Sequence, residues 1–344
     1  MNFLSDRRMI NLNDIITFIL VLIFPILLPL VIKNPYIIHL FIMTCIGIVL
    51  GMSFSMAYAP GLINIGVAAY YSIGAYASTL LVKKLDFSFW AALPVAILIT
   101  GIISLVTGLA FIKAGTFTFV ILTLLFNLAL VQALGQVEVL GGWSGFVNIP
   151  RPEPIVIPYY SAIDFSTHTS CYYLILVMLL LIVLAFYGLY SSRIGRAWNA
   201  IRQSSHLAET LGVDVYFFRV FAFVVASCAA GTVGSFYAHY FGTLEPVTFG
   251  GFASIYIQLY SVLGGLDFPI LGPIIGAIIM TFVPEVLRIT SEIQPIIFGV
   301  LLIVLILFLP RGIIGSLHEA RKMPIYDKMA KEIRAWLSNK RKTV

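Results

Sequence analysis

The chain has 344 residues, of which 60% are hydrophobic and only 10% are charged, and its mean hydropathy is +1.01. Soluble domains are about 45–50% apolar and about 25% charged, so this composition excludes a water-soluble globular protein. The high aliphatic content excludes a disordered chain, and three widely spaced cysteines exclude a disulfide scaffold. The sequence therefore predicts an all-α polytopic membrane protein.

Stretches free of charged residues indicate the membrane crossings. A spanning helix needs about 20 apolar residues, because the hydrocarbon core is about 30 Å thick. The uncharged stretches are 15–32, 34–82, 87–112, 114–137, 165–192, 220–244, 246–266, 268–284 and 293–310. The second stretch holds two helices if it breaks at Ala59, Pro60 and Gly61, where proline removes a donor and glycine permits a turn. We expect about ten transmembrane helices, or about eight to ten if 246–266 or 268–284 is broken or re-entrant.

The distribution of positive charge predicts the orientation. Cytoplasmic loops carry an excess of lysine and arginine, and with the N-terminus inside most of the 21 basic residues fall on the inner side. Both termini are then cytoplasmic. The expected division is a cytoplasmic N-terminus (1–14), a transmembrane domain (15–310) with an outer loop (135–170) and a cytoplasmic loop (191–216), and a basic tail (311–344). The tail suits the lipid bilayer surface or a cytoplasmic partner and not nucleic acid; an amphipathic helix and a solvated tail both fit it.

Several kinds of chemistry are absent from the sequence. Without a Gly-Lys dipeptide there is no phosphate-binding P-loop, and five scattered histidines with no Cys or His at ligand spacing predict no metal site. We therefore expect no enzyme, no catalytic residue and no cofactor. Acidic residues lie only at predicted membrane edges, which disfavours a proton- or sodium-coupled carrier without excluding one.

Uncharged polar residues at membrane depth are candidates for a translocation path. Such side chains can line a route for a mildly polar solute, or they can form hydrogen bonds between helices. The candidates are Ser53, Asn64, Ser72, Asn127, Gln132 and Gln258.

The cytoplasmic loop 191–216 predicts a short helix that ends at Gly212, a residue suited to a left-handed stop. Small residues recur on one face at spacings of three and four, and Arg196 and Arg202 lie beside them. The expected face consists of Ala197, Ala200, Ile201, Ser204, Ala208 and Leu211. A narrow face of small side chains suits docking into a shallow groove on another protein.

These motifs, in this order, resemble the LivM-type permeases of ABC importers for branched-chain amino acids and related solutes. The resemblance covers roughly residues 35–315. It rests on the glycine-rich stretch 61–76, Lys113 to Leu124, the Gly-Gly loop at 141–145, the stretch from Ser192 to Gly212, and the motifs at 263–273, 284–288 and 309–312. Leu140 and the Asn-Ile-Gly at 64–66 depart from the family pattern, which leaves the substrate open.

The resemblance implies an ABC importer permease fold in a bacterial or archaeal plasma (inner) membrane. The implied partners are a LivH-like second permease, two LivG/LivF-like ATP-binding subunits that bind the ATP, and an external solute-binding protein. The stretch from Gly195 to Gly212 would be the coupling helix seated in an ATPase groove, with contacts expected from Gly195, Arg196, Ala197, Ala200, Ile201, Arg202, Ala208, Glu209 and Gly212. A stand-alone secondary carrier or facilitator of a small polar solute, and a purely structural membrane subunit, remain the alternatives.

Overall fold

The computed structural model describes residues 34–155 and 164–287, together with residues 25, 28–29, 32, 299–300, 303, 307, 309 and 312–316. In this part of the chain the regular structure is helical, apart from an isolated antiparallel bridge between Phe146 and Leu244. The all-α expectation is confirmed. The expected crossings at 15–32 and 293–310, the N-terminus and the basic tail lie almost wholly outside the described residues.

The described helices follow the uncharged stretches of the sequence closely. The long helices are α2 (Pro35–Tyr58), α3 (Val67–Leu85), α4 (Phe89–Phe111), α5 (Thr116–Gln136), α6 (His168–Ser191), α9 (Val215–Phe241), α10 (Gly251–Gly264) and α11 (Leu271–Leu287). The short elements are α7 (Arg193–Gln203), α8 (Ser205–Thr210) and the 3₁₀ turns η1 (Ile112–Ala114), η2 (Glu138–Leu140), η3 (Gly142–Ser144) and η4 (Pro246–Phe249). The predicted break after Tyr58 is confirmed.

Five described helices, α2, α4, α5, α6 and α9, are long and apolar enough to cross a membrane. Helix α10 has 14 residues and rises only about 21 Å at 1.5 Å per residue, less than the hydrocarbon thickness. It therefore fits the expected alternative of a broken segment.

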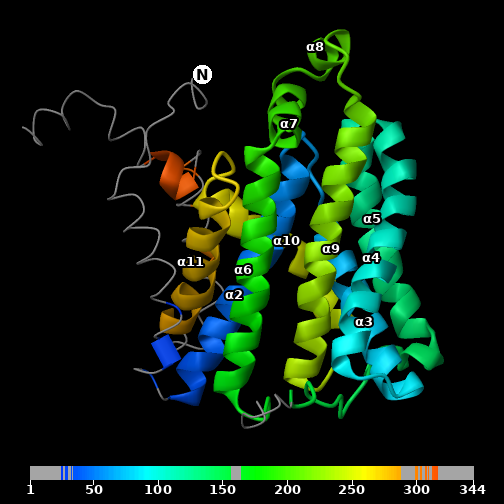
Figure 1. Cartoon of the computed structure of the whole chain (residues 1–344), viewed down its shortest axis with the longest axis vertical. Coiled ribbons are helices and arrows are strands. Elements are labelled where there is room, and N and C mark those ends of the chain that lie inside the picture. Colours follow the sequence, from blue (N-terminus) through cyan, green and yellow to red (C-terminus); the bar gives the residue numbers. More distant parts are fainter. Residues whose placement is uncertain are drawn as a thin grey trace, which may run out of the picture.

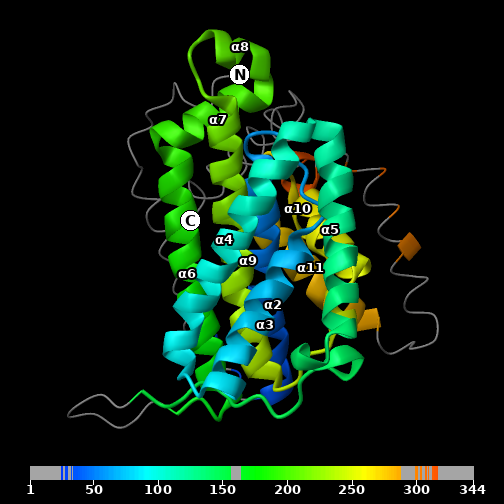
Figure 2. The same ribbon diagram turned by 90° about the vertical axis from the view of Figure 1, so that its right-hand side faces the viewer.

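Helix α9 lies at the centre of the bundle and packs against α3, α4 and α2. The helices run side by side along the long axis of the molecule, with α10 and α11 packed on each other and on α2 (Figures 1 and 2). Helices α7 and α8 project beyond one end, whereas the α3–α4 and α5–α6 connections lie at the other end (Figure 1).

Large apolar side chains cover the outer faces of the bundle. On α6, Val177, Leu181 and Leu184 are each more than half exposed and lie on one side of the helix. On α4, Leu98 and Ile102 are exposed to a similar degree. Contiguous exposed apolar surface is typical of helices that face lipid, which supports the multi-pass membrane fold.

Candidate functional site

The stretch between α6 and α9 consists of two helices, so the single helix predicted over Gly195 to Gly212 is wrong. Ser204 adopts an extended conformation (φ −161°, ψ 107°) that ends α7, and its hydroxyl accepts a hydrogen bond from the amide of Leu207 (3.3 Å) to begin α8. Serine is a preferred N-cap because its side chain satisfies an amide that has no partner within the helix. Gly212 has a φ of +81°, as the predicted left-handed stop requires.

Helix α7 is fixed to its own bundle by a buried tryptophan. The indole of Trp198 is fully buried, donates a hydrogen bond to the carbonyl of Phe218 on α9 (3.0 Å), and lies edge-on to Tyr190 of α6, 5.8 Å between ring centroids. An aromatic side chain of this size buries a large apolar area and satisfies its single polar atom at the same time. The α7 helix is therefore a rigid extension of the α6–α9 pair.

The small face predicted for docking is buried at two of its six positions, Ile201 and Ala208, which corrects the prediction for these two residues. Ile201 and Ala208 are each 2% exposed and form a small cluster with Val215, and Gly195 is also buried. A Cβ on Gly195 would lie 2.1 Å from the carbonyl oxygen of Tyr190, so only glycine permits this contact. These three residues hold the loop against the bundle and present little surface to a partner.

The surface that the loop exposes combines two expected residues, Glu209 and Leu211, with Leu207, which was not among the expected contacts. Leu207 and Leu211 are 61% and 75% exposed, at and just beyond α8, where the chain projects furthest from the bundle (Figure 1). Arg196, Glu209 and Gly212 are exposed too, whereas Ala197 and Ala200 are half-buried. We call the exposed surface of Leu207, Glu209 and Leu211 the α8 tip.

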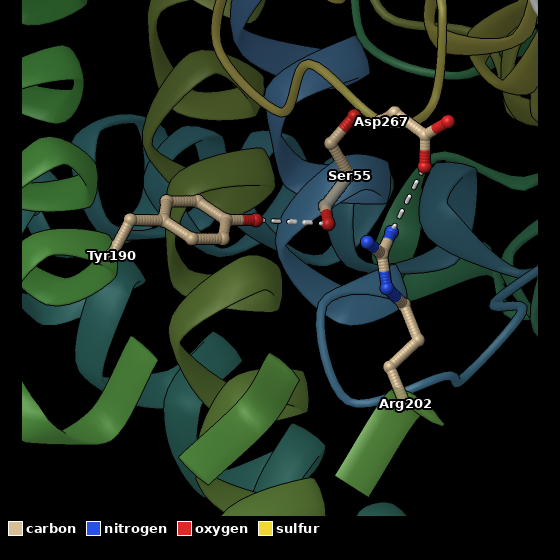
Figure 3. A network of polar contacts seen from close by, with 4 residues as sticks. All are labelled: Ser55, Tyr190, Arg202 and Asp267. Carbon is tan, nitrogen blue, oxygen red and sulfur yellow. Dashed lines mark hydrogen bonds and ion pairs between the residues drawn. The ribbon is translucent and has the colours of Figure 1, made fainter. Parts of the chain in front are cut away.

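Arg202 connects α7 to two other parts of the bundle. Its guanidinium lies 3.6 Å from the carboxylate of Asp267, in the α10–α11 connection (Figure 3). The guanidinium carbon also lies 5.7 Å from the ring centre of Tyr58 at the end of α2. Beside this ion pair, the hydroxyl of Tyr190 donates to the carbonyl of Ser55 on α2 (3.0 Å). Sequence reasoning selected Arg202 but missed Asp267 and Tyr190, because their partners lie far away along the chain.

The α2–α3 turn (59–66) lies beneath α7 and reaches into the bundle. A Cβ on Gly61 would lie 3.9 Å from the Cα of Arg202. Further along the turn, the amide of Ile65 donates to the hydroxyl of Thr123 on α5 (3.3 Å), while the side-chain oxygen of Asn64 accepts from the amide of Gly66 (2.9 Å). The α2–α3 turn therefore contacts both α7 and the buried face of α5.

Most residues predicted for a translocation path make hydrogen bonds inside this chain. Ser53 donates to the carbonyl of Ala226 on α9 (2.7 Å), Ser72 donates within its own helix (2.8 Å to Ala69), and Gln258 also donates within its helix (3.4 Å to Ser254). Asn64 shapes the α2–α3 turn, and Gln132 is exposed on α5. Ser53 therefore fits the alternative of hydrogen bonds between helices, whereas Ser72, Gln258 and Asn64 bond within their own helix or turn.

Asn127 is different from the other candidates. It is fully buried on α5, and neither its amide nitrogen nor its amide oxygen has a hydrogen-bond partner. Across the described ranges there is also no group of three His, Cys, Asp or Glu residues that could hold a metal ion.

The long apolar helices and their exposed apolar faces define a multi-pass membrane protein. The family model described as the branched-chain amino acid transport system permease component matches residues 36–310, and the chain belongs to this family. The expected recognition, the all-α multi-pass membrane fold and the plasma (inner) membrane location are therefore confirmed, and the chain is a permease subunit.

The chain is also similar to individual branched-chain amino acid transport permeases. The chain is 25% identical over 300 residues to the high-affinity branched-chain amino acid transport system permease protein LivM of Salmonella typhimurium and to that of Escherichia coli, across 82% of this chain and 70% of each relative. It is also 28% identical over 226 residues to a probable branched-chain amino acid transport permease protein LivH of Methanocaldococcus jannaschii, across 63% of this chain and 69% of that relative. No solved structure matches the chain.

Proposed function

We propose that this permease imports branched-chain amino acids or a related small solute, that separate ATP-binding subunits drive it, and that an external binding protein delivers the solute. The α8 tip carries the proposal, because an exposed apolar surface on a rigid projection is suited to docking against another protein. The names of the LivM relatives support the substrate class.

The proposed assembly contains a LivH-like second permease beside this chain and two LivG/LivF-like ATP-binding subunits beneath the α7–α8 end. The similarity to LivH proteins supports the pairing, because related chains can form a pseudo-symmetric pore. The α7–α8 end is then cytoplasmic, as are both termini. This chain needs no cofactor of its own, since ATP is bound by the partner subunits.

The coupling residues divide into two groups by burial. Leu207, Glu209 and Leu211 contact the ATP-binding subunit, and Arg196 adds charge at the edge of that contact. The buried members of the predicted set position the loop instead: Gly195, Ile201 and Ala208. Ala197 and Ala200 contribute at the margin, and Gly212 provides the turn that returns the chain to α9.

A displacement of the α8 tip would reach the bundle along two routes. The first route is the ion pair of Arg202 with Asp267, which lies in the connection between α10 and α11. The second is the α2–α3 turn, whose Ile65 amide is hydrogen-bonded to Thr123 on α5. Packed elements of this kind move as units, because interiors are too dense to deform continuously. Closure of the ATP-binding subunits would thereby shift α5 and α10 together.

Disruption of the α8 tip tests the proposal. In the complete transporter, the double variant Leu207→Ser and Leu211→Ser should lose copurifying ATP-binding subunits and lower leucine uptake at least about tenfold, since it removes two exposed apolar contacts of about 1.4 kcal/mol in total or more. Val247→Ser is the matched control, because Val247 is an equally exposed apolar residue (67%) on η4, away from α8.

Two outcomes contradict this proposal. The first is retention of both ATP-binding subunits and uptake in the double variant. The second is sustained leucine uptake by the purified chain in vesicles without partners, which would favour the stand-alone carrier.

A further inference from the structure

In the described part of the chain, Asn127 is one of three residues, beside Tyr76 and Arg219, with buried side-chain polar atoms that have no hydrogen-bond partner, and it is the one in which both a donor and an acceptor group are unpaired. Buried amides are almost always hydrogen-bonded, because an unmade hydrogen bond costs free energy, and a hydrocarbon environment supplies no water to replace it. Other buried polar side chains of the bundle illustrate the usual solution: Ser53, Thr79 and Ser227 each donate to a backbone carbonyl at 2.7–2.8 Å. The amide of Asn127 has neither its donors nor its acceptor satisfied.

The neighbours of Asn127 place it where three helices meet. The ring of Phe126 stacks on Tyr70 of α3, with 5.7 Å between centroids. On the other side, a Cβ on Gly251, at the start of α10, would lie 3.5 Å from the side chain of Leu128. Asn127 lies between these two contacts in sequence and on the buried face of α5 that also carries Thr123. Asn127 therefore lies on the stretch of α5 between its contact with α3 and its contact with α10, and its side chain is buried there.

The chemistry of a primary amide indicates the kind of partner it would accept. The group offers two N–H donors and one carbonyl acceptor and carries no charge. A solute that satisfies both ends must present an acceptor and a donor close together, as the carboxylate and ammonium of an amino acid do. An aliphatic side chain on that solute would suit the aromatic surroundings, where Tyr70 also packs edge-on against Phe223, 5.3 Å between ring centroids.

The junction of α5 with α3 and α10 is connected to the projecting loop. Thr123, one helical turn before Asn127, accepts a hydrogen bond from Ile65, and Ile65 belongs to the α2–α3 turn that lies against Arg202 of α7. A shift of α7 would therefore act on the α5 face that carries the amide. This link gives a route by which the driven motion could open the junction.

We propose that Asn127 contacts the transported amino acid, and that its amide binds the solute's carboxylate and ammonium when α5 separates from α3 and α10. This inference rests on the proposed function and specifies one residue of its solute path. The structure has the junction closed around the unpaired amide, so solute binding and an open junction are linked: the state that pairs the amide is the state that admits the solute.

The test uses the complete transporter in vesicles with radiolabelled leucine and saturating, loaded binding protein. Asn127→Leu removes the hydrogen-bonding groups while it keeps the number and branching of the side-chain heavy atoms, and it should lower the maximal uptake rate at least about tenfold without lowering the Tm of the purified chain. Asn127→Gln restores a donor and an acceptor and should recover part of the rate. Thr79→Val is the matched control, since Thr79 is equally buried but bonds within its own helix (2.8 Å to Ala75), and it should leave uptake unchanged.

Each outcome has a definite meaning. Uptake by Asn127→Leu at the wild-type rate overturns the inference, as does a loss accompanied by a lower Tm, which would make Asn127 a structural residue. Lack of ATP-dependent uptake by the wild-type complex would instead contradict the proposed function, so the two failures are distinguishable.

Discussion

The contact between α3 and α9 depends on glycines, and the substitution Gly74→Ala, which adds one methyl group, tests this dependence. A Cβ on Gly74 would lie 2.1 Å from the carbonyl oxygen of Gly231 and 2.4 Å from its Cα. The reverse contact is equally close, since a Cβ on Gly234 would lie 2.0 Å from the carbonyl oxygen of Tyr71. Both collisions are with backbone, so no side chain can rotate away. The helices themselves must separate.

The magnitude follows from the geometry. An ordinary contact begins at about 3.4 Å, so Gly74→Ala requires about 1.3 Å of additional separation. A gap of only about 0.5–1 Å already forfeits about a quarter to a half of each dispersion contact. Overpacking costs about 1–3 kcal/mol, and we expect the upper end here because the obstruction is backbone. At about 2–4 °C per kcal/mol, the Tm should fall by about 6 °C or more.

The assay is thermal unfolding of the purified chain in detergent, with Gly188→Ala as the control. Gly188 lies in α6 with no atom within 4 Å of its added Cβ, so alanine there should leave the Tm unchanged or raise it slightly. Equal Tm values for Gly74→Ala and the wild type would refute the reasoning that close backbone approach holds α3 on α9.

Three further predictions concern the loop. Gly195→Val should lower leucine uptake per ATP hydrolysed about tenfold, because the side chain cannot fit beside the Tyr190 carbonyl; an unchanged ratio in the complete transporter would contradict this. Arg202→Gln and Asp267→Asn should each move the Tm by less than about 4 °C, since exposed pairs contribute about 1 kcal/mol or less, yet their effects on uptake should not add in a double-mutant cycle; additivity would count against the Arg202 route. Ser204→Ala should cost about 1 kcal/mol of local stability and speed hydrogen exchange over 205–210, and unchanged exchange would exclude the capping role.

The sequence determined the class of this protein and most of its helices. Hydropathy is a local property, so uncharged stretches located α2 to α6 within a few residues, and Pro60 with Gly61 marked the break between α2 and α3. The ordered motifs led to the permease family, which the family match over 36–310 bears out. Gly212 was correctly placed as a left-handed stop, because a positive φ is a short-range requirement.

Only the tertiary structure decided which helix faces are buried in the bundle and which are exposed. Periodicity cannot distinguish an outward face from one that packs on its own bundle, so Ile201 and Ala208 were expected at a partner surface and are buried instead. The ion pair of Arg202 with Asp267 joins residues far apart in sequence. Ser53 and Asn127 had the same status in the sequence, yet one is paired across helices and the other is unpaired. Whether a polar group finds a partner depends on which helices meet at its depth, and that is set by packing between distant segments.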